Sequence, residues 1–502
     1  MAQDQTNSAD VLIALAPGTG ALRQRLEQAI LGDIASGRLA PGTALPPSRT
    51  LADTLGISRW VVTEAYGHLV GKGVLEARTG SGTRVAAVAP GESLVEPVET
   101  RFRQAQPAVR GPGLERAPDR ATHDLAPGVP DLRHVPREAW ARAARDALAE
   151  ATNQDLGAQP PAGHPAARAA VATHLRRSRV VSGPDDAVVL TRGAADGMSR
   201  IAAALSAAGH THLLVEDPSW AALRDVATGA GLVPVPVPVD DAGISPDRLR
   251  VEAARTGARA ALLTPAHQFP LGAALSDERR SGLLDWAREV DGLIIEDDYD
   301  AEFRYDRRPV PALQGLDPDR VLLLGSTSKT LAPAFGIGWM VVPQRWRAPV
   351  LDVSVRRGPA PGPATLDQLT LARFVADGAY ARHLRAARTR YARRRAALLA
   401  GLDRELPGAL VGGIAAGMHV TVDLAGVRVG ADAAAVDAVV DAAAVVREGA
   451  ARDVALVDLR RYQATPSARS TALVVGYGNL ADARLAEALR CLRAAVEAAV
   501  SG

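Results

Sequence analysis

The sequence predicts two folded parts, a small α+β module at the N-terminus and a larger α/β domain that ends in a smaller α+β subdomain. Three observations lead to this prediction. The chain has 502 residues, which exceeds the size of one ordinary domain. Residues 87–122 carry five prolines among scattered charges, and the hydrophobic periodicity changes across this segment. We therefore expect a module over residues 10–86, a semi-extended linker over 87–122, a large domain over 123–395 and a small domain over 396–502.

Residues 45–69 have the pattern of two short helices joined by a tight turn at Gly56–Ser58. Ser48 and Ser58 stand where each helix is expected to begin, and serine is a preferred N-cap residue. Two helices joined in this way form a helix-turn-helix, whose second helix enters the major groove of DNA. The glycine tip at residues 79–82, between two short β-type runs, then predicts a β-hairpin with the shape of a wing.

This module resembles the DNA-binding domain of GntR-type regulators, from LPPSRTLADTLGISRWVVTEAY through GKGVLEARTGSGTRV. Trp60 stands where many relatives have a small polar residue, which predicts an unusual sequence preference. Residues 1–86 hold eight basic and seven acidic side chains, so non-specific affinity for DNA should be modest and a dimer reading two half-sites is expected. The resemblance implies that a double-stranded DNA operator is contacted by Arg49, Ser58, Arg59, Trp60, Thr63, Gly80, Ser81 and Gly82.

Beyond residue 122, apolar β-type runs alternate with helical patterns rich in alanine, leucine and arginine. Continuous apolar strands separated by amphipathic helices predict a mostly parallel sheet that is covered on both faces. The runs are Ala187–Thr191, His212–Glu216, Val233–Val239, Ala260–Thr264, Gly292–Asp297, Val321–Gly325 and Ile337–Val342.

Lysine is almost absent, since Lys72 and Lys329 are the only two lysines among 58 Lys and Arg residues. A lysine that remains in such a sequence is a candidate for chemistry that arginine cannot perform, because lysine can lose its proton and act as an amine. Lys329 follows an apolar run that ends in a Ser/Thr cluster, and the preceding run ends in Asp297 and Tyr299. Both run ends are expected at the carboxyl edge of the sheet, where ligands bind.

This combination of side chains suits a carbonyl cofactor such as pyridoxal 5′-phosphate. A lysine amine holds the cofactor as a Schiff base, a carboxylate keeps the pyridine nitrogen protonated, and a phenol hydroxyl bonds the ring oxygen. Hydroxyl groups and backbone N–H groups at the start of a helix bind the phosphate.

The order of these pieces resembles fold-type I aminotransferases, and more narrowly the MocR family, in which that fold follows a GntR-type winged helix. Matching fragments include VVLTRGAADGM, VEDPSWAALR, TPAHQFPLG, IIEDDYDAEFRYDRRPVPAL, GSTSKTLAP and ARHLRAARTRYARRR. The resemblance implies that Lys329 bears the Schiff base, with Asp297 as the pyridinium partner and Tyr299 as the donor to the phenolate oxygen. The further cofactor-binding residues that it implies are Trp220 for the ring stack, His267 for the ring oxygen, and Gly193, Ala194, Ser326 and Ser328 for the phosphate.

Three positions depart from the family pattern. Gly336 replaces an arginine that binds the cofactor phosphate in relatives, Ala158 replaces a tyrosine that reaches the partner subunit's phosphate, and ALVVGYGNL lacks the arginine that holds a substrate carboxylate. Each lost charge-assisted contact matters by about 1.5–3 kcal/mol. Arg192 is a candidate to return a cation to the phosphate site, and Arg461 is the nearest candidate for binding an effector carboxylate.

The leading hypothesis is a ligand-responsive transcription regulator, a homodimer that binds DNA and senses pyridoxal phosphate, or an amine or amino acid that reacts with it, at Lys329. This hypothesis expects no enzymatic turnover beyond a residual transaminase half-reaction. Two alternatives stay open: a pyridoxal-phosphate-dependent aminotransferase with an accessory DNA-binding module, and a regulator whose degenerate cofactor site senses another ligand. Cys491 is the only cysteine and no signal peptide or membrane span is evident, so we expect a cytoplasmic protein without a metal site or a membrane partner.

Overall fold

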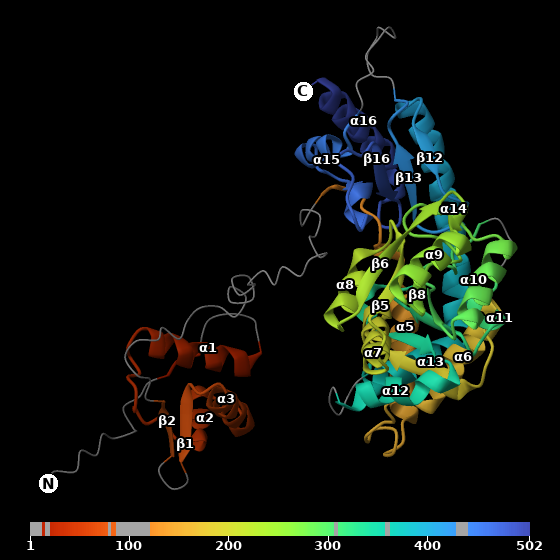
Figure 1. Cartoon of the computed structure of the whole chain (residues 1–502). Helices are drawn as coiled ribbons and strands as arrows, with labels where there is room; N and C mark the ends of the chain where they lie inside the picture. Colours follow the sequence, from red (N-terminus) through yellow and green to blue (C-terminus); the bar gives the residue numbers. More distant parts are fainter. Residues whose placement is uncertain are drawn as a thin grey trace. The chain divides into compact units, whose positions relative to one another are not determined.

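The computed structural model describes residues 13–15, 21–78, 82–86, 121–305, 310–356, 362–427 and 440–501. The chain divides into two compact units, Met1–Val109 and Arg110–Gly502 (Figure 1). No described helix is both long enough and apolar enough to cross a membrane.

The described part of the first unit is a winged helix-turn-helix. Its elements are α1 (Leu22–Ala35), α2 (Ser48–Leu55), α3 (Arg59–Gly71), β1 (Leu75–Arg78) and β2 (Gly82–Val85), and the two strands pair as an antiparallel hairpin. The apolar faces of the helices enclose a core of buried side chains that includes Leu26, Ile30, Leu51, Val62 and Leu69. Gly80 and Ser81, which were predicted to form the wing tip, lie outside the described residues.

The predicted turn between α2 and α3 is present, but one of the two predicted caps is wrong. Gly56 ends α2 in the left-handed region at φ 66°, which glycine adopts at little cost. The hydroxyl oxygen of Ser58 accepts a hydrogen bond from the backbone N–H of Val61 at 3.4 Å, which confirms the cap of α3. Ser48 makes no capping bond because helix α2 already begins at this residue, and its hydroxyl instead accepts from Arg59 Nε at 3.4 Å.

The second unit is built on a sheet of eight strands in the order β4-β11-β10-β9-β8-β5-β6-β7. All seven predicted runs form strands, and the pairs from β10 through β6 are parallel as expected. Strand β11 is antiparallel to both of its neighbours, so the sheet is mixed. The short segment 327–337 that joins β10 to β11 explains this, because a parallel connection needs a crossover of a dozen or more residues. The strands are β4 (Val188–Thr191), β5 (His212–Asp217), β6 (Val233–Asp240), β7 (Gly243–Ile244), β8 (Ala260–Leu263), β9 (Leu293–Asp297), β10 (Val321–Ser326) and β11 (Gly338–Val341).

Helices cover both faces of this sheet (Figure 1). Neighbouring residues of one strand therefore enter different cores: Ile295 packs in one cluster with Met198, and Ile294 packs in another with Trp286. The surrounding helices are α5 (Arg137–Glu150), α6 (Pro165–Arg179), α7 (Ala194–Ala207), α8 (Ala221–Gly229), α9 (Pro246–Thr256), α10 (Asp277–Glu289), α11 (Leu313–Leu316), α12 (Gln344–Arg356) and α13 (Thr365–Ala376). Short 3-10 turns lie at η1 (Leu132–His134), η2 (Asp185–Ala187), η3 (Pro333–Phe335), η4 (Leu459–Tyr462) and η5 (Asp482–Arg484).

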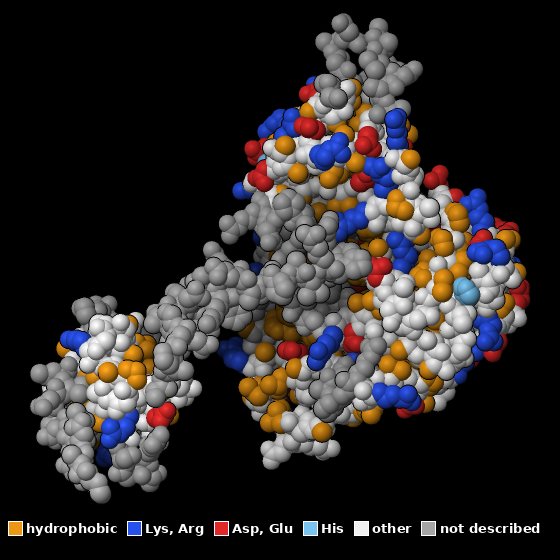
Figure 2. Space-filling view, turned by 60° about the vertical axis from the view of Figure 1, so that its left-hand side comes forward, with side chains coloured by type: hydrophobic (Ala, Val, Ile, Leu, Met, Phe, Trp, Pro, Cys, Tyr) orange, Lys and Arg blue, Asp and Glu red, His pale blue; other side chains and the backbone are white. Residues whose placement is uncertain are grey.

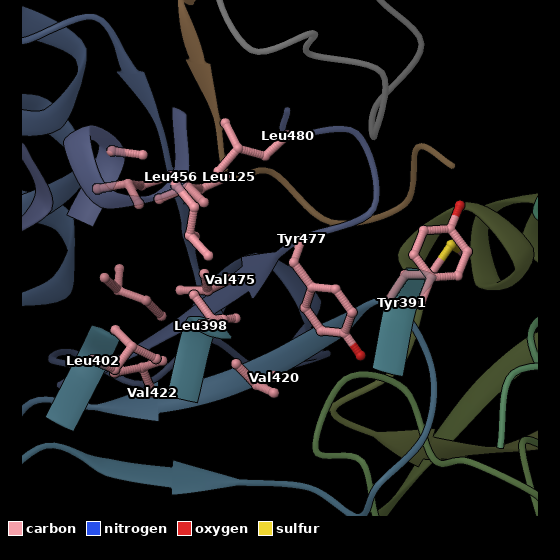
Figure 3. Close-up of a cluster of buried hydrophobic side chains, with 14 of the residues drawn as sticks. Leu125, Tyr391, Leu398, Leu402, Val420, Val422, Leu456, Val475, Tyr477 and Leu480 are labelled. Atoms are coloured by element: carbon pink, nitrogen blue, oxygen red, sulfur yellow. The ribbon is translucent and has the colours of Figure 1, made fainter. Parts of the chain in front are cut away.

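The smaller subdomain has a four-stranded sheet in the order β12-β13-β16-β15. Figure 3 shows its core, in which Leu402 lies beside Val422 and Leu398 lies beside Val475. Strand β3 (His123–Asp124) pairs with β14 (Val454–Ala455), so the first strand described in the second unit joins this subdomain. Helix α14 runs unbroken across residue 395, where the sequence suggested a boundary, because its apolar spacing continues on both sides. The elements are α14 (Ala379–Glu405), β12 (Leu410–Gly412), β13 (His419–Asp423), α15 (Ala442–Ala451), β15 (Val457–Asp458), β16 (Ala472–Gly476) and α16 (Leu485–Ser501).

Charges on the second unit are mixed in sign. On the face that Figure 2 shows, basic and acidic side chains lie interspersed, in agreement with the 58 basic and 56 acidic residues of the chain.

Arg394 of α14 is a charged residue that lies buried instead of at the surface. Its guanidinium donates to Asp131 at 2.8 Å, to Asp482 at 2.6 Å and to the backbone oxygens of Tyr477 and Gly478 at 3.0 and 2.6 Å. One side chain thus ties α14 to the segments that enter and leave the small sheet.

We predict that Arg394→Ala lowers the free energy of unfolding by about 3–5 kcal/mol, because it breaks the buried ion pair with Asp131 Oδ2 and leaves Arg133, which is largely exposed, as the remaining arginine partner of Asp131. Thermal denaturation of the full chain measures the effect. The control is Arg393→Ala, which removes an exposed arginine from the same helix and should leave the melting temperature nearly unchanged. Equal melting temperatures for the two variants would contradict the prediction.

Candidate functional site

The parallel pairing of β9 with β10 places the predicted acid and lysine at one edge of the sheet. Asp297 is the register partner of Leu324, and the chain continues from β10 to Lys329. The Lys329 ammonium donates to the backbone oxygen of Gly128. Burial lowers the pKa of Lys329, while the carboxylates of Asp297 and Asp300 act in the opposite direction. The pKa shift favours the neutral amine, the form that reacts with a carbonyl group.

Asp297 is buried, with 5% of its surface exposed, and its Oδ1 atom has no hydrogen-bond partner among the described residues. Burial raises the pKa of Asp297 to about 7, the neighbouring Asp298 adds to the rise, and Lys329 opposes it. A buried acceptor without a partner is uncommon in a folded protein. The arrangement offers one carboxylate oxygen to a ligand that carries an N–H donor.

The neighbouring acids of the same strand have structural partners. Glu296 accepts from the backbone N–H groups of Leu313 and Gln314 at 3.1 and 3.0 Å, and Asp298 pairs with the buried Arg179 at 2.8 Å. Because side chains alternate along an extended chain, Glu296 and Asp298 point away from the face that Asp297 occupies.

Tyr299, His267 and Asp300 form one hydrogen-bonded cluster. His267 Nδ1 lies 2.9 Å from the hydroxyl oxygen of Tyr299 and 2.9 Å from Asp300 Oδ2. A Cβ atom at Gly417 would lie 2.3 Å from the His267 ring, so the close approach of that glycine is a condition for the cluster. The structure therefore brings together Tyr299 and His267, the two residues predicted to contact the same ring oxygen.

His419 lies beside this cluster, with its ring centroid 5.2 Å from that of His267. Burial lowers the pKa of His419 to about 3, so it is neutral. Ligand atoms of His267, Asp300 and His419 lie within 4.8 Å of one another, a combination that metals favour. His419 Nε2 contacts the oxygen of Pro270 at 3.1 Å and His267 Nδ1 contacts Asp300 Oδ2 at 2.9 Å, whereas Asp300 Oδ1 has no hydrogen-bond partner among the described residues.

The residues predicted to hold a phosphate group converge at the start of α7. Gly193 is its N-cap at φ 126° and Ala194 is its first residue, so free backbone N–H groups point out of the helix there. Ser326 pairs with Gly338, and a Cβ atom at Gly338 would lie 2.6 Å from the Gly193 Cα atom. These contacts place the end of β10 against the start of α7. The backbone N–H of Ser328 donates to Ser326 Oγ at 3.4 Å, so Ser328 lies beside Ser326.

The positions predicted to depart from the family pattern carry no charged side chain at Gly336 and Ala158. Gly336 has φ 58°, and a Cβ atom there would meet no other atom within 4 Å. Arg192 is exposed, and its Nε donates to the backbone oxygen of Gly362 at 3.2 Å. Ala158 is exposed in the loop between α5 and α6 and presents no hydrogen-bonding side chain.

Trp220, the predicted ring-stacking residue, is 40% exposed at the N-cap of α8, just after β5. The turn that carries it is attached to the segment after Arg461. The backbone N–H of Ser219 donates to the oxygen of Tyr462 at 2.9 Å, and Arg224 donates to the same oxygen at 2.9 Å. The predicted effector contact and the predicted stacking residue therefore belong to segments that are joined by hydrogen bonds.

Sequence reasoning missed Arg224 and Glu216. Arg224 gives no sequence signal for its link to the small subdomain, because the acceptors there are backbone oxygens 238 and 239 residues away. Glu216 does give one: a charged residue ends the apolar run of β5. It is 1% exposed, its Oε2 atom accepts from the hydroxyl of Thr264 at 2.5 Å, and its Oε1 atom has no described partner. Burial raises the pKa of Glu216 to about 7.

In the first unit, the residues predicted to contact DNA lie exposed on α2 and α3. Arg49, Arg59, Trp60 and Thr63 are exposed, and Ser58 begins α3. The bond of Arg59 to Ser48 links the two helices at this surface.

Comparisons with known proteins match each unit to a family. Residues 22–85 match the family described as bacterial regulatory proteins, gntR family, and residues 123–460 match aminotransferase class I and II.

Two curated relatives match most of the length of the chain. The chain is 33% identical to the HTH-type pyridoxine biosynthesis transcriptional regulator PdxR of Corynebacterium glutamicum, over 82% of this chain and 86% of the relative. It is 34% identical to the probable rhizopine catabolism regulatory protein MocR of Rhizobium meliloti, over 77% of this chain and 78% of the relative. Among solved structures, a multiple substrate aminotransferase from Thermococcus profundus has a similar fold, with a TM-score of 0.66 at 23% identity, covering 81% of this chain and 96% of that one.

Proposed function

Since the chain belongs to the family of HTH-type transcriptional regulators that join a gntR-type domain to an aminotransferase class I and II domain, we propose that it regulates transcription in response to pyridoxal phosphate, or to an amine or amino acid that reacts with this cofactor, at Lys329. The DNA-binding role follows from the family. The ligand, its attachment to Lys329 and the assembly into a homodimer are parts of the proposal.

One observation carries the proposal: the unpartnered Oδ1 atom of Asp297 lies in the same buried site as the amine of Lys329. Bound pyridoxal phosphate supplies an aldehyde that reacts with amines and a ring that withdraws electrons. Lys329 would hold the aldehyde carbon through its amine, and Asp297 would accept the ring N–H. Tyr299, kept in place by His267 and Asp300, would donate its hydroxyl hydrogen to the ring oxygen.

Other positions of the second unit argue for ligand sensing over catalytic turnover. Gly336 and Ala158 supply no charge or hydroxyl to the phosphate, and the stretch ALVVGYGNL, which begins with strand β16, has no arginine where aminotransferases hold a substrate carboxylate. An accessory module on a working aminotransferase is the second candidate, and the fold of the second unit favours it. The two differ in turnover: a regulator should show at most a single half-reaction with an amino donor and keto acid present in excess.

The main test measures DNA affinity of the full chain for the DNA upstream of its own coding sequence, with and without pyridoxal phosphate. The proposal expects at least a fivefold change in the dissociation constant, since a ligand that shifts a regulator must bind its two states differently. Equal affinities at saturating cofactor, combined with sustained transamination, would support the aminotransferase candidate instead.

We predict that pyridoxal phosphate attaches to Lys329 and not to Lys72. After incubation and borohydride reduction, mass spectrometry should find the added pyridoxyl group on the peptide that contains Lys329, because burial lowers the pKa of this lysine and so raises its fraction of neutral amine. Lys329→Ala should abolish the modification and Lys72→Ala should leave it unchanged. Labelling that persists in Lys329→Ala at the wild-type level would contradict the prediction.

We predict that Gly336→Arg strengthens pyridoxal phosphate binding by about 2–30-fold. The new guanidinium adds a charge-assisted contact of about 1.5–3 kcal/mol, and the left-handed backbone costs a non-glycine residue about 1 kcal/mol. The matched control, Gly336→Ala, carries the strain without the charge. Titration of both variants with the cofactor, followed by absorbance, compares their affinities, and equal affinities would show that position 336 does not face the phosphate.

In the same titration, Arg192→Ala should weaken cofactor binding if Arg192 supplies the missing cation.

A further inference from the structure

The exposed face of helix α3 has a defined centre. The buried side chains of this helix are Val62, Ala65, Tyr66 and Leu69. Successive residues of an α-helix are turned by about 100°, so the opposite side is centred on the line Trp60, Glu64 and Gly67. All three residues are exposed, and Trp60 is 69% exposed. We call the line of these three residues the reading face.

Packing within the first unit does not explain the reading face. Gly67 lies inside α3, where glycine destabilises a helix relative to alanine, yet a Cβ atom at this position would meet nothing within 4 Å. Glu64 makes no hydrogen bond or ion pair within the part of the chain that the structure describes. The reading face thus consists of three residues at positions i, i+4 and i+7. They are a mostly exposed tryptophan, a carboxylate without a partner among the described residues, and a glycine that packing does not require.

The residues that flank this line are held by other contacts. The hydroxyl of Thr63 donates to the backbone oxygen of Arg59 at 3.0 Å, and Arg59 Nε donates to Ser48 at 3.4 Å. On the other side, His68 contacts Glu27 of α1 at 2.8 Å. The flanks are therefore oriented within the unit, and the central line is free to meet a partner.

We propose that Trp60, Glu64 and Gly67 form the surface that reads the operator sequence in the major groove. Trp60 packs against the C5-methyl group of a thymine, Glu64 accepts a hydrogen bond from the N4 amino group of a cytosine, and Gly67 lets the backbone of α3 approach the base edges closely. The proposal rests on the DNA-binding role of this unit, which matches the gntR family over residues 22–85. The exposed Arg49 and Arg59, next to this line, suit the phosphates on the rim of the groove.

The spacing restricts the sequence that this face reads. Four residues of helix rise by about 6 Å between Trp60 and Glu64, and base pairs are stacked about 3.4 Å apart. The thymine and the cytosine should therefore lie within about two base pairs of each other in each half-site.

Replacing Gly67 by alanine should change the stability of the protein and its affinity for DNA in opposite directions. Gly67→Ala should raise the melting temperature of the full chain, yet weaken binding to a duplex selected by the wild-type protein from a random library by at least fivefold. The matched control is Gly32→Ala on α1, another exposed helical glycine whose Cβ atom would meet nothing within 4 Å. It should raise the melting temperature and change the dissociation constant less than twofold. Equal binding by the two variants would overturn the proposal.

The roles of Trp60 and Glu64 are tested through the base preference of the protein, because removing any acid near DNA raises affinity for every sequence. Selection from the random library should replace the cytosine by adenine for Glu64→Gln, since glutamine pairs with adenine. Asp53→Asn, which removes the same charge from α2, should bind more tightly with an unchanged preference. Replacing the thymine by uracil should weaken wild-type binding at least threefold and leave Trp60→Ala unaffected.

The outcomes distinguish failure of the reading face from failure of the DNA-binding role. Unchanged preferences in Glu64→Gln and Trp60→Ala would overturn the reading face while the wild-type protein still selects a sequence. Failure of the wild-type protein to select any duplex would overturn the reading face together with the DNA-binding role.

Discussion

The parallel pairing of β9 with β10 is the constraint on which the ligand site depends. It aligns Asp297 with Leu324, so that the acid at the end of one strand lies beside the strand that leads to Lys329. The alternation of side chains then separates the acids of β9, sending Glu296 and Asp298 to structural partners and Asp297 to the site. If Asp298 lost Arg179, the structure would retain a second uncompensated acid next to Asp297. The ion pair between Arg179 and Asp298 therefore neutralises an acid that would otherwise add negative charge next to Asp297.

The site has more buried acid than buried cation among the described residues. Glu216 and Asp297 each have a pKa of about 7, and each keeps one oxygen without a described partner. Desolvation is the first cause of both shifts, which means that a ligand able to donate hydrogen bonds is favoured at these atoms. The ring N–H of pyridoxal phosphate is such a donor. Lys329, with its pKa lowered, supplies the amine that the same ligand needs.

The sequence was sufficient for the strands and the winged helix, because each leaves a local signal, and it also singled out Lys329 as a candidate site residue. Apolar runs predicted the seven strands, the turn at Gly56–Ser58 predicted the helix-turn-helix, and the surviving Lys329 stood out against an arginine-rich background. The direction of β11 and the path of α14 across residue 395 were not predictable, because they depend on loop length and on packing with distant segments. Arg224 escaped for the same reason, since its partners are backbone oxygens far along the chain.

In the proposed function, a phosphate site with few charged contacts fits a sensor better than it fits an enzyme. An enzyme gains from a cofactor that never leaves, whereas a sensor responds only if its dissociation constant lies near the concentrations it must report. Each charge-assisted contact of about 1.5–3 kcal/mol changes affinity by about 10–150-fold, so the loss of the arginine side chain at Gly336 alone moves the occupied fraction into a different concentration range. A Cβ atom at Gly336 would meet no other atom within 4 Å, so packing leaves room for that side chain, while the left-handed backbone costs a non-glycine residue about 1 kcal/mol. Its absence is therefore not imposed by packing, and weaker retention of the phosphate becomes a property that a regulator can use.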